Sequence, residues 1–155
     1  MDRALFTLRV GTVFEHSPWV AARTASARPF ATRAELQGAL FDTVMKASDD
    51  EKIGLIRAHP DLVGDADLTN ESRSEQQSAG LDDLSADERE RLRDFNRRYC
   101  ERFGFPFVIC AGENKKEATL VAFPRRLTNS REQEIETALQ EIFKIAELRL
   151  RDLIP

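Results

Sequence analysis

Residues 130–153 read SREQEIETALQEIFKIAELRLRDL and form the longest helical pattern in the chain. Ser130 to Gln133 match a capping box, in which the serine side chain caps the helix and the residue three positions later reaches back. Apolar side chains then recur at helical spacing, which predicts an amphipathic helix over about 131–152. Its apolar face consists of Ile135, Ala138, Leu139, Ile142, Ile145, Ala146 and Leu153.

Three further capping boxes mark the starts of other predicted helices. Thr32–Glu35 opens a helix over 33–47. Ser48–Glu51 opens a helix that Pro60 must end, and Ser85–Glu88 opens a helix that Gly104 closes. A serine cap followed by proline at the first helical position predicts a short helix near the N-terminus, and another is expected within 3–14. The motifs are Thr32–Glu35, Ser48–Glu51, Ser85–Glu88 and Ser17-Pro18-Trp19.

Residues 105–127 do not follow one pattern. Phe105 to Ala111 is an apolar run that contains a proline, which predicts a short, buried extended segment. The residues after 114 are open to two interpretations, because a helix could start there or 119–123 could form a strand against 107–110. Pro124 would bend a helix at this point.

These patterns predict an all-α fold, with at most one pair of strands. A length of 155 residues predicts a single domain over 1–155, a multi-helix bundle with a short extended segment near 105–111. A chain of this size can bury roughly 70% of the surface that it exposes when unfolded, so it needs no disulfide or metal to hold a core.

Composition excludes several classes of function. Hydrophobic residues make up 41% and charged residues 32%, as in a soluble globular protein. The net charge of −4 is spread along the chain, which argues against a nucleic-acid-binding face. No apolar run reaches the ~20 residues of a membrane span, and residues 1–6 lack a signal-peptide core. Two cysteines form no disulfide framework, so we expect a cytoplasmic protein.

His59 is the first candidate for chemistry, since Pro60 ends a helix directly after it and a polar stretch follows. One interpretation is structural: a histidine at a helix C-terminus interacts well with the helix dipole. The other is catalytic, with an imidazole held at a fixed angle over a cavity. The same dipole would favour the protonated form, which suits a proton donor near neutral pH.

Ser72, Glu75 and Gln76 form the second candidate group. They are three and four residues apart, so in a helical turn they share one face. A solvated turn is the plain interpretation. As a site, this face offers a hydroxyl, a carboxylate and an amide to a polar heterocycle. A carboxylate near His59 would also fix its tautomer and raise its pKa.

Arg149 lies within the apolar face of the last helix, although guanidinium groups are almost never buried without a partner. It is either one half of a structural ion pair or a ligand for an anionic substrate. Residues 107–111 offer a third element, because an unpaired extended segment leaves backbone N–H groups for a ligand. Cys110 is expected to be a small buried apolar residue, and His16 to lie on the surface.

No metal or cofactor motif is apparent in the sequence. Two histidines 43 positions apart and no cysteine cluster provide no zinc or iron site. There is no phosphate loop and no dinucleotide fingerprint. Any chemistry is therefore expected to be acid–base work without a cofactor.

Several motifs taken together resemble the 2-oxo-4-hydroxy-4-carboxy-5-ureidoimidazoline (OHCU) decarboxylase family. They occur in order over residues 12–153, and jointly they are specific although each is short. They are Ser17-Pro18-Trp19-Val20-Ala21, Arg28-Pro29-Phe30, Ala58-His59-Pro60-Asp61-Leu62, Leu68-Thr69-x-x-Ser72-x-x-Glu75-Gln76-x-x-Ala79-Gly80-Leu81, Asn96-x-x-Tyr99 and Phe103-Gly104-Phe105-Pro106-Phe107-Val108-Ile109-Cys110.

The resemblance implies an all-α enzyme, a homodimer, that converts OHCU to (S)-allantoin and CO₂ in urate degradation without a cofactor. By matching motifs, it implies that His59, Glu75 and Arg149 are catalytic. The substrate contacts that it implies are Pro60, Ser72, Glu75, Gln76, Phe107, Val108, Ile109, Cys110, Ala111 and Arg149.

Two features depart from the family pattern: the connection between His59 and Ser72 is a few residues short, and Pro124 interrupts an expected helix. Two other functions remain open on the sequence alone. One is a cofactor-free lyase or hydrolase acting on another ureide, which the same polar groups would serve. The other is a non-catalytic helical binding module, which would have no need for the combination of His59, Glu75 and Arg149.

Overall fold

The computed structural model describes residues 1–60, 85–110 and 116–155, with side chains described from Thr119 onward in the last range. All regular elements in these ranges are helical, which confirms the expected all-α class. The predicted loop over 61–71 and the helical turn over 72–79 lie outside the described residues. Within the described part, no helix is long and apolar enough to cross a membrane.

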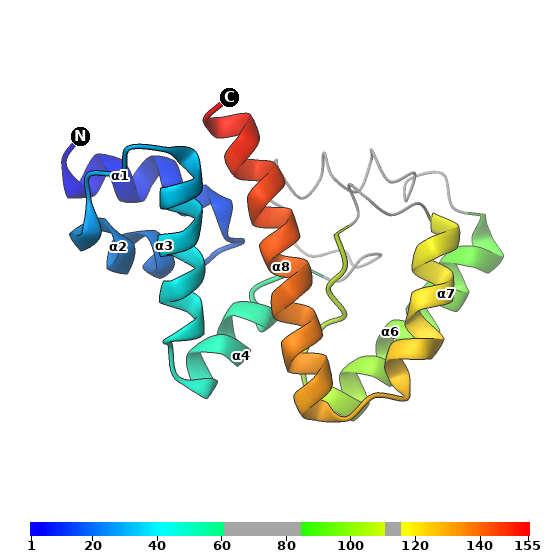
Figure 1. Ribbon diagram of the computed structural model, residues 1–155. Coiled ribbons are helices and arrows are strands. Elements are labelled where there is room, and N and C mark those ends of the chain that lie inside the picture. Colours follow the sequence, from blue (N-terminus) through cyan, green and yellow to red (C-terminus); the bar gives the residue numbers. More distant parts are fainter. Residues whose placement is uncertain (61–84, 111–115) are drawn as a thin grey trace.

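The N-terminal third is a layer of short helices (Figure 1). Helix α1 packs against α2, and α2 packs against α3. The apolar side chains buried between them include Phe6, Val20 and Leu40. The elements are α1 (Arg3–Val10), a 3₁₀ turn η1 (Gly11–Val13), α2 (Trp19–Thr24), a second 3₁₀ turn η2 (Ala25–Ala27) and α3 (Arg33–Met45).

Two of the predicted helix starts in this layer differ in part from expectation. Ser17 does not cap α2, because its hydroxyl donates to the carbonyl of Glu15 instead. Thr32 does accept from the Glu35 N–H, but the Glu35 carboxylate reaches one residue further back, to the Ala31 N–H. The box at Thr32 is therefore only half formed, although the helix that it predicts is present.

The capping boxes at Ser48, Ser85 and Ser130 are confirmed, each with both reciprocal hydrogen bonds. They open α4 (Asp49–Arg57), α6 (Ala86–Phe103) and α8 (Arg131–Leu153). Helix α6 ends as predicted at Gly104, whose φ of +80° is a left-handed conformation that glycine adopts without strain.

Residues 116–127 form helix α7 (Lys116–Leu127), so the alternative of a strand over 119–123 is wrong. The burial pattern gives the reason. Thr119 and Phe123 are buried, whereas Val121 between them is 60% exposed. A strand would place all three on one face, but a helix separates the middle residue from the other two. Pro124 is accommodated inside the helix.

Helix α8 passes through the middle of the molecule in Figure 1, between the N-terminal layer and the pair α6–α7. It packs against α3 and α4, and side chains from α6 and α7 reach it through hydrogen bonds. A cluster of aromatic rings fills the space towards α6 and α7, with Phe107 stacked on Phe123 at 3.7 Å between centroids. Its other members are Phe95, Tyr99, Phe103 and Phe105.

Candidate active site

His59 lies directly beyond the end of α4, where Pro60 prevents the helix from continuing. Its side chain is only 7% exposed. The ring atom Nδ1 is 3.0 Å from the Leu55 carbonyl oxygen, one turn earlier in the helix. Because a carbonyl oxygen can only accept, this contact places a proton on Nδ1 and fixes the ring.

Burial lowers the pKa of His59 to about 4, and the positive charges of Arg149 and His16 act in the same direction. The hydrogen bond to Leu55 raises the pKa, but it does not offset the burial. The prediction that the helix dipole keeps this histidine protonated is therefore wrong. Burial destabilises the charged imidazolium more than the helix dipole stabilises it. At neutral pH the ring is uncharged, and Nε2 carries the lone pair that can accept a proton.

Arg149 is buried in α8, as the apolar face of that helix indicated, with 6% of its surface exposed. Its Nη2 atom lies 3.7 Å from Oε2 of Glu15, which is also buried. Its Nη1 atom is 3.4 Å from the Thr12 carbonyl oxygen and 3.5 Å from that of Val13. The ion-pair interpretation of Arg149 is thus supported, while its contact with substrate stays a prediction.

A second histidine, His16, lies in the turn that follows η1. His16 is exposed, as expected, and has a φ of +47°, the only positive φ among the described non-glycine residues. An open hollow of about 450 Å³ lies beside Thr12 and His16, bordered by α1 and the turn that follows it. Of the predicted site residues that the structure describes, none lines this hollow.

The segment 105–110 runs outside any helix, as predicted, and the side chains of Phe107, Val108, Ile109 and Cys110 are buried. Its backbone is held at two points. Arg126 donates to the Val108 carbonyl at 2.6 Å, and the Cys110 N–H donates to Glu141 at 3.4 Å. The expectation that this segment offers free N–H donors therefore fails at Cys110.

Sequence reasoning missed two buried carboxylates in α8. Glu134 is fully buried and Glu141 is 8% exposed, and both bind groups that lead to the 105–110 segment. The signal was present, since Glu134 lies four and eight positions before Ala138 and Ile142 on the apolar face. The same reasoning had identified Arg149.

Of the predicted site residues, Arg149 is near enough to His59 for its positive charge to lower the pKa of the ring, and Pro60 follows His59 directly in the chain. Ser72, Glu75, Gln76 and Ala111 lie outside the described residues, and their predicted contacts remain predictions. Among the residues that the structure does describe, no three His, Cys, Asp or Glu side chains are grouped as metal ligands would be.

These features define a helical protein whose buried, neutral histidine lies near a buried arginine. The profile of the family described as OHCU decarboxylase matches residues 1–151. A 2-oxo-4-hydroxy-4-carboxy-5-ureidoimidazoline decarboxylase from Haloferax volcanii is 43% identical over 152 residues, which cover 98% of this chain and 90% of that protein. The chain belongs to the OHCU decarboxylase family.

Two further relatives extend the comparison. A uric acid degradation bifunctional protein from Bacillus subtilis is 38% identical over 154 residues, covering 99% of this chain and 31% of that protein. The crystal structure of an OHCU decarboxylase in the presence of (S)-allantoin matches with a TM-score of 0.77 and 28% identity. That match covers 92% of this chain and 94% of the other.

Proposed function

We propose that this protein is a carboxy-lyase that converts OHCU to (S)-allantoin and CO₂ in urate degradation. The observation that carries the proposal is the buried His59, neutral at physiological pH and fixed through Nδ1, beside the charge of Arg149. A neutral imidazole with a free lone pair on Nε2 is suited to general base catalysis. Membership of the OHCU decarboxylase family supports the choice of substrate.

The proposed reaction begins with the hydroxyl on the carbon that bears the carboxylate. His59 Nε2 accepts the hydroxyl proton, which leaves an oxyanion on that carbon. The bond to the carboxylate breaks, CO₂ leaves, and the electron pair forms a double bond to the neighbouring carbon while the C=N pair moves onto the ring nitrogen. The oxyanion becomes a carbonyl as the neighbouring carbon takes up a proton on one face, which determines the S configuration. The ring nitrogen takes up a second proton; His59 returns one of the two, and water supplies the other.

The other predicted residues have supporting roles in this proposal. Arg149 and the 107–111 backbone hold the ring carbonyls and the ureido group. Glu75, with Ser72 and Gln76, orients the substrate or His59, as the matched motif implies. We further propose that the whole chain, 1–155, is one domain that acts as a homodimer in the cytoplasm. Light scattering tests the dimer, and cell fractionation tests the compartment.

The test generates OHCU in situ from urate with a urate oxidase and a hydroxyisourate hydrolase, and follows (S)-allantoin by circular dichroism. We expect His59→Asn, which can still donate to the Leu55 carbonyl, to lower kcat/KM by about 10²- to 10⁴-fold. The matched control is His16→Asn, because asparagine tolerates a positive φ and His16 is exposed. It should stay within about five-fold of the wild type. A wild-type protein that changes neither the rate nor the enantiomeric excess would refute the proposal.

A further inference from the structure

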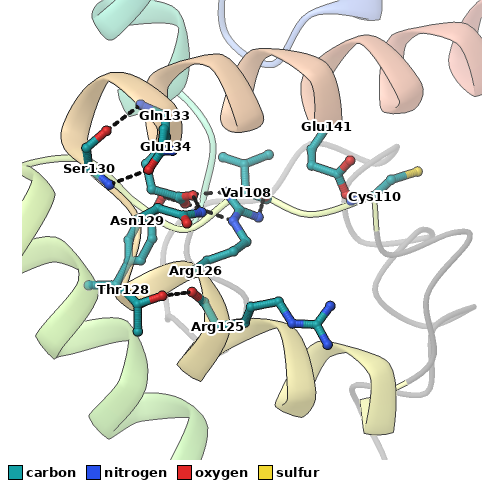
Figure 2. A network of polar contacts seen from close by, with 11 residues as sticks. Val108, Cys110, Arg125, Arg126, Thr128, Asn129, Ser130, Gln133, Glu134 and Glu141 are labelled. Carbon is teal, nitrogen blue, oxygen red and sulfur yellow. Dashed lines mark hydrogen bonds and ion pairs between the residues drawn. The ribbon is translucent and has the colours of Figure 1, made fainter.

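A buried ion pair that does not include His59 joins α7 to α8. Arg126 Nε is 2.8 Å from Oε1 of Glu134, and the two side chains are 8% and 0% exposed. The same carboxylate oxygen accepts from the Tyr99 hydroxyl at 2.5 Å, and Oε2 accepts from the Asn129 amide at 2.8 Å. Figure 2 shows this network around the Arg126 guanidinium. Glu134 is thus held by three donors and holds Arg126 in a single position.

The free end of that guanidinium binds the backbone of the 105–110 segment. Nη1 donates to the Val108 carbonyl oxygen at 2.6 Å. The guanidinium carbon also lies 4.2 Å from the centroid of the Phe107 ring, within the range of a cation–π contact. One side chain therefore fixes both a ring and a carbonyl in consecutive residues, and it does so from the α7–α8 side.

The direction of the Val108 carbonyl determines the direction of the next N–H. The only cis peptide bond among the described residues is Arg28–Pro29, so the bond from Val108 to Ile109 is trans and planar. In such a peptide the C=O and the following N–H point in opposite directions. With the Val108 carbonyl turned towards Arg126, the Ile109 N–H is turned away from α7 and α8.

The contact at Cys110 agrees with this orientation. In an extended chain the hydrogen-bonding groups of alternate residues lie on the same edge, so the Val108 C=O and the Cys110 N–H should face the same way. The second of these groups does meet α8, at Glu141. The Ile109 N–H lies on the other edge, and no described residue accepts a hydrogen bond from it.

A purely structural role would not require charge at this position. Buried ion pairs contribute little net stability, and apolar residues of similar volume often serve as well. An arginine does offer several donors in a rigid fork, so it can hold a carboxylate and a carbonyl at fixed relative positions. That property is of use where the direction of one peptide matters.

We propose that Arg126 is a positioning residue, which turns the Val108–Ile109 peptide so that the Ile109 N–H donates to the bound substrate. The proposal rests on the proposed function and adds a residue to it. Arg126 does not touch the substrate and acts only through this peptide. Glu134 in turn holds Arg126.

The closing experiment compares Arg126→Lys with Arg131→Lys. A lysine at position 126 keeps the charge opposite Glu134, but one ammonium cannot replace both the Nε and the Nη1 contacts. Arg131 is the matched control, since its Nε also donates to a backbone carbonyl, that of Phe103 at 3.2 Å, outside the 105–110 segment. Each variant is assayed with OHCU made in situ and titrated with (S)-allantoin by calorimetry, with thermal unfolding as the measure of stability.

We expect Arg126→Lys to raise KM and the Kd of (S)-allantoin together by about 3- to 10-fold, the size of one hydrogen bond, with kcat within about two-fold. Arg131→Lys should leave both constants unchanged. If the role is structural only, Arg126→Lys will lower the melting temperature while the folded protein keeps wild-type KM and Kd, which overturns the inference alone. If the wild type neither forms allantoin faster nor binds it, the proposed function fails as well.

A measurement on the wild type covers the case in which Arg126→Lys does not fold. Amide ¹H–¹⁵N shifts are followed while (S)-allantoin is added. The Ile109 amide should shift strongly and become protected from exchange, whereas the Cys110 amide, already bound by Glu141, should change less. The opposite order at these two amides would overturn the inference.

Discussion

The titration of His59 should make the stability of this protein depend on pH between about 4 and 6.5. The pKa falls from 6.5 to about 4 in the folded protein because the ring is buried. The unfolded chain therefore takes up a proton at a higher pH than the folded one. Stability from this group is fully present above pH 6.5 and is lost as the pH falls towards 4.

The size of the effect follows from the shift. At about 1.4 kcal/mol per pKa unit, a fall from 6.5 to about 4 corresponds to roughly 3 kcal/mol in the free energy of unfolding. About 2 kcal/mol of this should be lost between pH 7 and pH 4.5. The small exposed fraction of His59, 7%, means that solvent screening does not reduce this value greatly.

The assay is urea unfolding at pH 7, 6, 5 and 4.5, for the wild type and for His59→Asn. Asparagine does not titrate, and its amide can take the place of Nδ1 at the Leu55 carbonyl. Subtracting the two curves removes the contributions of all other groups. We expect the free energy of unfolding of the wild type, minus that of His59→Asn, to fall as the pH falls from 7 to 4.5. A flat difference, or a wild type that gains stability relative to the variant in acid, would refute the assignment of a buried, neutral His59.

Three other predictions concern stability and can be measured by urea unfolding at pH 7. Glu134→Ala should lower the free energy of unfolding by about 3–5 kcal/mol, because it leaves the buried Arg126 charge unpaired; a loss under 1 kcal/mol would mean that water reaches this pair. Gly104→Ala should cost about 1–2 kcal/mol at a φ of +80°, whereas Gly54→Ala, with open space around it inside α4, should stabilise by up to about 1 kcal/mol. Equal effects at the two glycines would contradict this reasoning. Ser48→Ala should cost about 1 kcal/mol through loss of the N-cap of α4, and no change would show that the cap contributes nothing.

The helix boundaries were predictable because their signals are local. A capping box satisfies N–H groups within four residues, so Ser48, Ser85 and Ser130 specify where helices begin regardless of what packs on them. Pro60 and Gly104 end helices for similarly local reasons. The conformation of 119–123 was not predictable in this way, because Pro124 obscured the helical pattern and only the exposure of Val121 separates helix from strand.

The protonation state of His59 was mispredicted because the sequence contains only one of the two opposing effects. The dipole of α4 is visible in the sequence, since Pro60 marks the helix end. The burial of the ring is a property of the folded chain, and the positive charges of Arg149 and His16, which add to its effect, come from other parts of the sequence. Glu134 was missed for a related reason: a glutamate on a helix is normally solvated, and its partners Tyr99 and Arg126 lie on two other helices, α6 and α7.

Helix α8 carries buried charges at Glu134, Glu141 and Arg149, and this arrangement limits how the chain can change in length. Each residue added to or removed from a helix turns everything beyond it by about 100° and shifts it by about 1.5 Å. A single deletion between Glu141 and Arg149, eight positions apart, would swing one charge out of its contacts while leaving the other in place. Insertions and deletions among relatives should therefore fall in the connections between helices, and the spacing of these charges should be invariant.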